Sequence, residues 1–458
     1  MSRRVRSLLP GATPISRSDA EAITKRALSF SGADEARVTI NGQVRGNTRF
    51  AVNQVSTAGD DSDTTITVDS SFGKRSASAT TNKLDDEGLR WVVQTSERLA
   101  KLAPEDPEAM PELGPQQYQE TKGWSEATAA LDPAGRVSAV RSITDPARGA
   151  GMNATGYLES NGEARAVATS KGLFAYGRST VVSMTTTVRT DSATGSGWAG
   201  AAHSDWSRIA PAELGARAIE KARLSENPAA VEPGRYTVIL EPTAVGNLVQ
   251  LIAFALNARG ADEGRSFFTR PGGGNKIGMK VVDERVSLVS DPLDPDAAAY
   301  TFAGDGLPVK RTAWIENGVV KNLAYDRYWA KKQGKEPTPM VGSLRMSGGA
   351  QSVDEMIAST RRGILVTRFW YIRPVDPRTI LYTGLTRDGT FLIENGKITR
   401  AVKNLRFNES PIFMLNNLEA MGEPVRVSAS EDGSPGFAIV VPPIKTRDFT
   451  FTSLSDAI

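Results

Sequence analysis

Cysteine is absent from the sequence, and histidine occurs once, at His203. Without cysteine the chain can form no disulfide, no thiol nucleophile and no thiolate ligand for zinc or an iron–sulfur cluster. One histidine excludes a metal site built from two imidazoles, and a Ser-His-Asp triad would have to use His203 itself. Ser204 and Asp205 adjoin His203, but the groups of a triad approach one another from different directions. A structural or surface role is therefore predicted for His203.

Charge of one sign is not in excess, and long hydrophobic runs are missing. The 458 residues include 55 Lys and Arg against 52 Asp and Glu, a net charge of +3. Proteins that bind nucleic acid usually concentrate basic residues on one face, so no nucleic-acid partner is expected. The longest apolar stretch, residues 248–256, contains Gln250 and is too short to span a bilayer. Because no targeting segment is recognisable, we expect a cytoplasmic protein without a membrane partner.

The sequence does contain a mixture of helical and strand periodicities separated by glycines. Its 42 glycines and 40% hydrophobic residues are typical of a globular protein with many turns. Helical spacing of apolar residues predicts helices at residues 18–31, 85–103, 125–131, 133–140, 211–224 and 243–259. Alternating patterns predict strands at residues 37–40, 43–45, 49–55, 64–68, 76–80, 156–159, 164–169, 180–189 and 236–240.

Four Asn-Gly pairs between strand-like segments predict type I′ hairpins, since both central residues of that turn need a positive φ. The pairs are Asn41-Gly42, Asn161-Gly162, Asn317-Gly318 and Asn395-Gly396. Prolines at residues 104–115 predict an irregular linker, and the composition changes near Glu226. These patterns predict an α+β fold with two domains. Residues 1–225 would form a helix-plus-antiparallel-sheet domain, and residues 226–458 a β-rich domain with one buried apolar helix.

Four segments are candidates for chemistry. The loop at 271–274 lacks the spacing of a phosphate-binding loop and is interpreted as a flexible loop near a cleft or interface. Acidic residues at 283–305 could hold Ca²⁺ or Mg²⁺, but their Asp-Pro pairs favour turns. The helix at 243–259 is apolar on nearly all faces, which predicts burial. The segment at 368–377 is rich in aromatic residues and arginine. It indicates either a cleft or partner surface, or a buried strand whose arginines reach outward. The candidates for such a surface are Arg368, Phe369, Tyr371 and Arg373.

Motifs in the second half of the chain together resemble the TldD/PmbA family, the metallopeptidase-related "modulator of gyrase" proteins. The carriers are GRYTVILEP at 234–242 leading into the apolar helix, RPG at 270–272 with KIG at 276–278, DG at 305–306, WIENG at 314–318, TRFWYIR at 367–373 and LIENGKI at 392–398. The resemblance covers nearly the whole chain and is strongest from residue 233 to 423. Each motif alone is weak, but their order and spacing are specific.

The resemblance implies a metal site that this chain has lost. Catalytic members of the family carry an HExxxH segment whose histidines bind zinc and whose glutamate acts as general base, and a later cysteine adds a ligand. The matching positions here are Gln250, Leu251, Ala255 and Trp370. Leucine cannot take a proton, alanine cannot ligate, and glutamine is a poor zinc ligand. Catalytic and metal-binding residues are therefore expected to be absent from this chain.

The resemblance points to the non-catalytic TldE/PmbA-like branch. It implies a subunit that pairs with a catalytic TldD-like chain and helps to form a cleft for unfolded or small peptides. We expect the chain to be inactive alone, with no cofactor of its own and with zinc on the partner. Two alternatives stay open. One is a stand-alone peptide-binding or regulatory protein, and the other is a diverged hydrolase that uses Asp283, Asp305 or Asp376.

Overall fold

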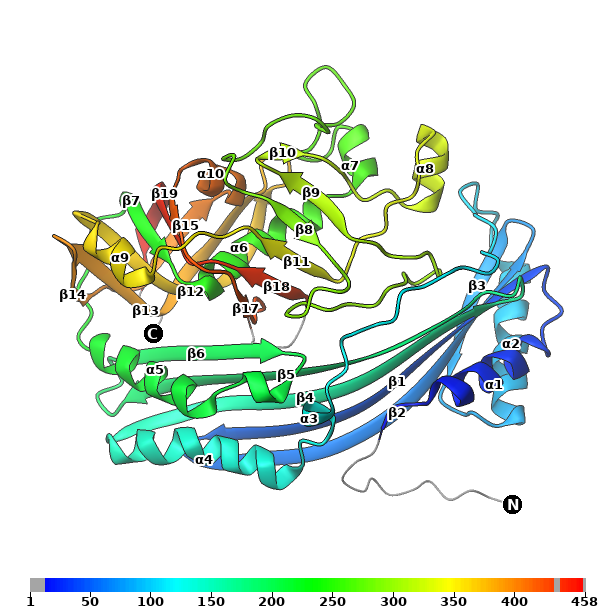
Figure 1. Ribbon diagram of the computed structural model, residues 1–458, viewed down its shortest axis with the longest axis horizontal. Coiled ribbons are helices and arrows are strands. Elements are labelled where there is room, and N and C mark those ends of the chain that lie inside the picture. The colour runs from blue at the N-terminus through cyan, green and yellow to red at the C-terminus, as the bar shows by residue number, and fades with distance from the viewer. Residues whose placement is uncertain (1–12, 432–436, 456–458) are drawn as a thin grey trace.

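The N-terminal half is built on one antiparallel sheet of very long strands (Figure 1). The structure, a computed structural model, describes residues 13–431 and 437–455. In sheet order the strands are β3 (Arg75–Thr81), β2 (Gln54–Phe72), β1 (Glu35–Ala51), β4 (Met152–Thr169), β5 (Phe174–Thr190) and β6 (Ser196–His203).

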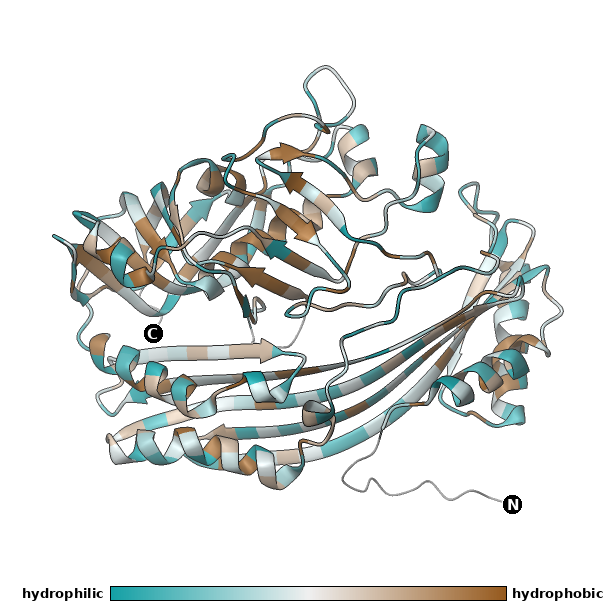
Figure 2. Ribbon diagram, viewed as in Figure 1, coloured by the Kyte–Doolittle hydropathy of each residue, from teal (hydrophilic) through white to brown (hydrophobic). Residues whose placement is uncertain are grey.

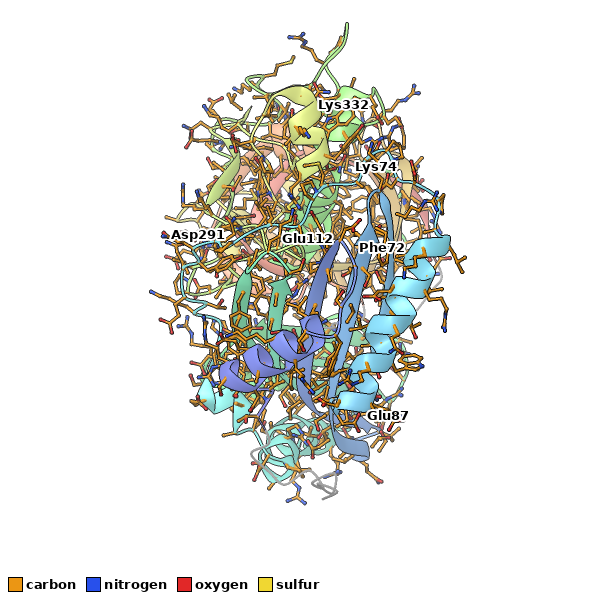
Figure 3. All side chains as sticks on the ribbon, turned by 90° about the vertical axis from the view of Figure 1, so that its right-hand side faces the viewer. Phe72, Lys74, Glu87, Glu112, Asp291 and Lys332 are labelled. Carbon is orange, nitrogen blue, oxygen red and sulfur yellow. The ribbon has the colours of Figure 1, made fainter. Side chains whose placement is uncertain are left out.

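Helices cover one face of this sheet. α1 (Arg17–Leu28) packs against β1, β4 and β5. α2 (Asp86–Leu102) packs against β2 and β3, where Figure 3 labels Phe72 of β2 and Glu87 of α2. α4 (Pro133–Gly149) packs against β4, β1 and β2, and α5 (Pro211–Leu224) packs against β5, β6 and α4. The short α3 (Glu126–Ala129) contacts β4, β5 and the 3₁₀ turn η1 (Trp206–Arg208). Two apolar clusters fill these contacts, one around Ile40 and Leu89 and the other around Val188 and Leu214. Because side chains alternate along a strand, the intervening residues face the other way. Most of them are polar, but Val167 and Ala175 form a small apolar cluster with Phe302 of the C-terminal half.

Two of the predicted hairpins are wrong. Asn41 pairs with Arg165, and Asn161 with Arg45, in the middle of the uninterrupted strands β1 and β4. The predicted short strands of this region merge into strands of 17 and 18 residues. An Asn-Gly pair permits a tight turn but does not impose one when the flanking residues gain full ladders on both sides. The turn between β1 and β2 lies instead at Val52 and Asn53, whose φ angles are +50° and +59°.

The glycines of these two pairs are needed for close packing rather than for turning. A Cβ on Gly42 would lie 3.0 Å from Cγ2 of Ile15, and one on Gly162 would lie 3.3 Å from the Trp124 ring. The segments that carry Ile15 and Trp124 therefore lie directly on these two glycines, which explains why glycine occurs in the middle of the strands.

The C-terminal half contains a closed barrel and a second sheet. The barrel joins β12 (Arg362–Asp376), β7 (Gly234–Leu240), β19 (Ile444–Leu454), β15 (Leu405–Glu409) and β13 (Leu381–Glu394), and β13 pairs back with β12. β14 (Lys397–Ala401) and β16 (Leu418–Met421) extend it. The second sheet has the order β10 (Val319–Val320), β9 (Thr312–Glu316), β8 (Leu288–Ser290), β11 (Ser343–Met346), β18 (Ala438–Val441) and β17 (Val425–Val427). In Figure 2 the hydrophobic colouring is concentrated in these strands.

The other two predicted hairpins are confirmed. Asn317 and Gly318 have φ angles of +49° and +77°, and Asn395 and Gly396 have +51° and +77°. They connect β9 to β10 and β13 to β14. The observed mixture of helices and antiparallel strands also confirms the α+β fold class, whereas the division at residues 225 and 226 stays a prediction.

Several helix boundaries differ from the prediction. α1 begins at Arg17 rather than at residue 18, because Ser16 caps it: the Ser16 Oγ accepts a hydrogen bond from the Asp19 N–H. The helix predicted at 243–259 is two helices, α6 (Pro242–Ala255) and α7 (Ala258–Asp262), because the Asn257 side chain caps a new start. Leu99 and Leu102 of α2 are exposed, whereas Leu89 and Val92 at helical spacing from them are buried. The remaining helices are α8 (Arg327–Gln333), α9 (Val353–Ala358) and α10 (Pro411–Asn416). Among the described residues, none of these helices has the length and apolarity to cross a membrane.

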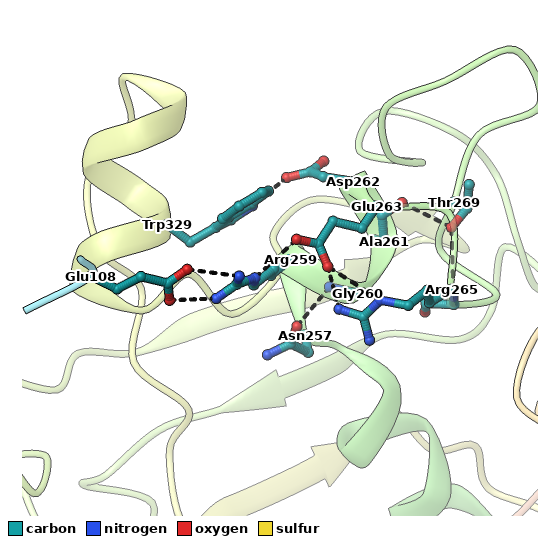
Figure 4. Close-up of polar contacts among 11 residues, drawn as sticks. Glu108, Asn257, Arg259, Gly260, Ala261, Asp262, Glu263, Arg265, Thr269 and Trp329 are labelled. Carbon is teal, nitrogen blue, oxygen red and sulfur yellow. Dashed lines mark hydrogen bonds and ion pairs between the residues drawn. The ribbon is translucent and has the colours of Figure 1, made fainter. Parts of the chain in front are cut away.

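The proline-rich linker at 104–115 is irregular, as predicted, but it is held in place. Arg259 of α7 makes a bidentate contact with the Glu108 carboxylate, with N–O distances of 2.7 and 2.8 Å (Figure 4). Trp329 of α8 donates a hydrogen bond to Asp262 in the same cluster. The linker thus ties the end of the long sheet to the C-terminal half.

Candidate functional site

The candidate site lies where helix α6 meets strand β12. α6 follows β7 directly and packs against β12, β17 and β18, between the barrel and the second sheet. Residues 243–249 and 251–253 of the helix are buried, in agreement with the predicted apolar helix. Its C-terminal end differs, because the Phe254 side chain is 65% exposed.

Asn247 fastens this junction. Its Oδ1 accepts a hydrogen bond from the Phe369 backbone N–H at 3.0 Å, and its Nδ2 donates to the Ala429 carbonyl at 2.7 Å. Gln250, one turn later, donates its Nε2 proton to the same Ala429 carbonyl at 2.7 Å. Asn247 is buried, so the hydrogen bonds to Phe369 and Ala429 take the place of bonds to water for both atoms of its amide. One side chain thus joins α6, β12 and the loop after β17.

The positions expected to correspond to the family's metal motif lie on the two elements of this junction. Gln250 is half-buried and holds the Ala429 carbonyl, Leu251 is buried in the main apolar cluster, and Ala255 packs against that cluster. Trp370 of β12 stacks with Arg368 and Arg387, whose guanidinium carbons lie 5.3 Å from the ring centroid in each case. The correspondence itself stays a prediction.

These side chains do not fit a zinc ion. Zinc sites in proteins use cysteine, histidine and carboxylate ligands. Leucine and alanine offer no lone pair, an indole N–H is only a donor, and the Gln250 amide already bonds to the loop. Within residues 13–431 and 437–455, no three His, Asp or Glu side chains gather in a way that could hold a metal ion. No metal-dependent step can be assigned to these residues.

Arg368 and Asp388 form a buried ion pair beside the junction. The Arg368 Nη2 lies 2.5 Å from Oδ2 of Asp388, and the two side chains are 9% and 2% exposed. Asp388 also accepts a hydrogen bond of 2.6 Å from the Ser196 hydroxyl of β6. Burial raises the pKa of Asp388, but Arg368 and Ser196 outweigh burial, so the pKa lies below its usual value. The network links the barrel to the long sheet.

The aromatic-arginine segment divides between the two interpretations left open by the sequence. Phe369 is fully buried and packs on Phe407, with ring centroids 4.6 Å apart. Arg368 is buried as well, so this part is a core strand. Tyr371 is exposed, and Arg373 stacks on it at 4.2 Å, as expected of a surface.

Both strands of this ribbon are distorted at the site. The pairing of β12 with β13 shifts its register between Val366 and Arg368 and again between Trp370 and Arg373. The φ angles of Asp388 and Tyr371 are +53° and +55°, unusual for residues with a side chain. Bulges of this kind re-aim side chains. In β13 the irregular backbone at Asp388 accompanies the contact between its side chain and Ser196.

A cavity of about 570 Å³ opens between the ribbon and the long sheet. Arg368, Trp370, Arg387 and Asp388 line one side, and residues of β4 and β5 line the other. A second cavity of about 450 Å³ lies beyond Asp388 and is lined by hydroxyl and amide side chains and Lys403. Figure 1 shows the barrel strands β12 and β13 above the β5–β6 edge of the sheet.

His203 lies apart from this site. It is buried at the end of β6, its Nδ1 accepts a hydrogen bond from the Asp205 N–H, and its Nε2 is 3.9 Å from Asp296. Burial, with Arg426 and Arg208 nearby, lowers the pKa of His203. The burial of His203 and its hydrogen bond to the Asp205 backbone are typical of a structural residue.

The acidic cluster is used for turns and ion pairs. Asp291 and Asp294 accept hydrogen bonds from N–H groups two residues ahead, which is turn chemistry. Arg345 contacts Asp294 and Asp296 at 2.5 and 2.7 Å. The glycine-rich loop at 271–274 is exposed and has three glycines with positive φ.

The aspartates of the hydrolase alternative have local partners. Asp283 binds Arg285 at 2.8 Å. Asp305 and Asp376 accept hydrogen bonds from the N–H groups of residues 307 and 378.

Comparisons with known proteins identify the family. The profile described as the PmbA/TldA metallopeptidase C-terminal domain matches residues 233–453, and that of the PmbA/TldA metallopeptidase central domain matches residues 123–226. The chain belongs to the PmbA/TldD family. The resemblance drawn from the motifs is thereby confirmed.

Several relatives are named as metalloproteases. A "metalloprotease" of Methanothermobacter thermautotrophicus is 26% identical over 50% of this chain and 52% of its own length. The "metalloprotease TldD homolog" of Buchnera aphidicola is 24% identical over 42% of each chain. A "zinc metalloprotease TldD homolog" of Saccharolobus solfataricus is 21% identical over 43% of this chain and 46% of its own length. The chain spans about half the length of the curated relatives that it matches.

Solved structures share the complete fold. TldE from Thermococcus kodakarensis superposes with a TM-score of 0.82 at 20% identity, covering 95% of this chain and 100% of that one. A candidate modulator of DNA gyrase from Bacteroides thetaiotaomicron gives 0.81 at 21% identity, covering 96% and 99%. At these identities the likeness establishes the fold alone.

Sequence reasoning missed the polar residues that organise the site. Asn247 lies within the helix predicted to be apolar, and Asp388 lies in a segment for which no helix or strand was predicted. The Asp388-Gly389 pair was a possible signal, since such pairs favour positive φ. Ser196 carried no signal, because its role depends on a neighbour 192 residues away.

Proposed function

We propose that this chain is a TldE-like, non-catalytic subunit of a heterodimeric TldD/TldE-type zinc metallopeptidase. The catalytic partner would hold the zinc ion, and this chain would help to form the cleft for unfolded or small peptides. The observation that carries the proposal is the intact junction of α6 and β12 without metal-ligating side chains at Gln250, Leu251, Ala255 and Trp370.

The hydrogen bonds of Asn247 and Gln250 support a scaffolding role for this junction. In a zinc enzyme the metal itself cross-links the elements that carry its ligands. Here the two amide side chains make that connection to Phe369 and Ala429. The junction can therefore keep its shape without metal, as a cleft-forming subunit requires.

The family names support a peptide as the substrate of the complex. Several relatives of this chain are called metalloproteases, and one is called a zinc metalloprotease. Extended peptides commonly bind by adding a strand to a sheet, where backbone hydrogen bonds give affinity and side-chain pockets give selectivity. The β-rich C-terminal half offers such strands.

Co-purification with a catalytic TldD homologue tests the proposal. We expect the isolated chain to bind less than stoichiometric zinc and to show no peptidase activity. The mixture should elute as a 1:1 complex, with one zinc ion per complex and cleavage of an unfolded peptide. A catalytic homologue whose general-base glutamate is replaced by glutamine is the matched control, since it should form the complex without cleaving. Stoichiometric zinc and cleavage by the isolated chain would overturn the proposal. Failure to form a complex would favour the stand-alone peptide-binding alternative.

A further inference from the structure

The cavity beside Arg368 has two chemically different walls. On the barrel side, the Trp370 ring stacks with Arg387 and Arg368. On the sheet side, Asn153, Thr155 and Thr187 present amide and hydroxyl groups. These residues share one face of the sheet, because Asn153 pairs with Arg189 and Thr155 with Thr187. An indole wall and a row of hydrogen-bonding groups suit the apolar side chain and the backbone of a peptide.

Arg189 is the charged group of this cavity that the fold leaves without a partner. It lies in β5 directly opposite Ser196, on the face turned toward Asp388. Its guanidinium makes no ion pair or hydrogen bond with any residue in the described ranges 13–431 and 437–455. Arg368 already bonds to Asp388, and Asp191 already accepts a hydrogen bond from Asn153. A ligand anion entering the cavity would therefore meet Arg189 without displacing an internal partner.

We propose that this cavity binds the C-terminal carboxylate of a peptide, with Arg189 as the anion partner and Trp370 as the wall for the terminal side chain. A guanidinium and a carboxylate form two parallel hydrogen bonds, which favours this anion over a neutral end group. The inference rests on the proposed role of the chain in forming a peptide cleft. It places the end of the peptide beside the α6–β12 junction, and this chain would then bind peptides that have a free C-terminal carboxylate more tightly than peptides that lack one.

Three labelled peptides with one neutral core sequence test the assignment on the isolated full chain. The first ends in a free carboxylate, the second in a carboxamide, and the third ends in a carboxamide but carries an internal glutamate. Fluorescence anisotropy should show the free acid binding about tenfold more tightly than either amide, as expected for a charge-assisted contact. Equal binding of all three peptides would overturn the proposal. Equal binding of the acid and the glutamate peptide would overturn the assignment to the C-terminus.

Variants link the selectivity to the residue. Arg189→Gln should lower the affinity for the free acid to that for the amide, and Arg189→Lys should keep part of the difference. Arg189 is exposed, so neither change threatens folding. Arg217→Gln, at an exposed position of α5, is the matched control and should change nothing. An unaltered acid preference in Arg189→Gln would refute the role of Arg189, and no binding of the acid up to millimolar concentration would refute the site. Because no catalytic partner is present, this result is independent of complex formation.

Discussion

Replacing Arg368 by methionine would remove the nearest counter-ion of the buried Asp388 carboxylate and leave only Arg387, whose Nε lies 3.7 Å from Oδ2. Asp388 is 2% exposed, so solvent cannot screen the change. Removing one partner of such a pair costs on the order of 3–5 kcal/mol of unfolding free energy. Asp388→Asn should cost less, because the remaining guanidinium still donates to the Glu431 carbonyl and stacks on Trp198 at 4.8 Å. The double variant should cost less than the sum of the two single changes, since the isolated charge is then gone.

The prediction also includes the direction in which the free energy of unfolding should change with pH. In the native protein the pKa of Asp388 lies below its usual value, so its stabilising contribution is present above about pH 4 and is lost as the pH falls further. Without Arg368, only Ser196 and Arg387 would oppose the effect of burial, so the pKa of Asp388 should rise. The variant should then lose stability as the pH rises from about 4 toward 7, and the double variant should not.

Urea unfolding of the four proteins at pH 5 and pH 7 measures this. Tryptophan fluorescence and circular dichroism should be followed together, because a chain of this size need not unfold in one step. The reasoning is refuted if the costs of Arg368→Met and Asp388→Asn add without coupling. It is also refuted if Arg368→Met is as stable at pH 7, relative to the native protein, as at pH 5.

Three further changes test other parts of the structure. Burial raises the pKa of Glu409 from 4.5 to about 7, so native stability should fall by roughly 3 kcal/mol as the pH rises from 4.5 to 7. Glu409→Gln should flatten this dependence in urea titrations, and an unchanged slope would contradict the assignment. Gly318→Ala should destabilise more than Gly73→Ala by thermal unfolding, since both have positive φ but only at Gly318 would a Cβ meet backbone, at 2.4 Å. Equal losses would show that the contact relaxes. Asn247→Ala should cost about 1–3 kcal/mol of unfolding free energy by stranding the buried Phe369 N–H, since Gln250 still donates to the Ala429 carbonyl. A loss below about 1 kcal/mol in urea unfolding would mean that water replaces the amide.

The absence of cysteine and the single histidine acquire a specific meaning in this family. A chain whose junction of α6 and β12 is held by Asn247 needs no metal to position these elements. The lack of metal-ligating side chains at this junction and the amide hydrogen bonds that hold it are consistent with each other, and both support the proposed cleft-forming subunit.

The sequence determined those features that depend on near neighbours. The turns at Asn317-Gly318 and Asn395-Gly396 follow from the local need for positive φ, and the apolar helix α6 follows from its composition. The family also followed from the sequence, because ordered motifs are a property of the chain itself.

Tertiary structure alone decided the rest, since the deciding contacts join residues far apart in the chain. Asn41-Gly42 has the same turn chemistry as Asn317-Gly318, yet β4 on one side and β2 on the other hold it straight. Arg368 is buried because it pairs with Asp388, which lies beside it on β13. Asp388 in turn is held by Ser196 of the other sheet. The cavity that exposes Arg189 exists only because the barrel packs on the long sheet, and no local pattern encodes that packing.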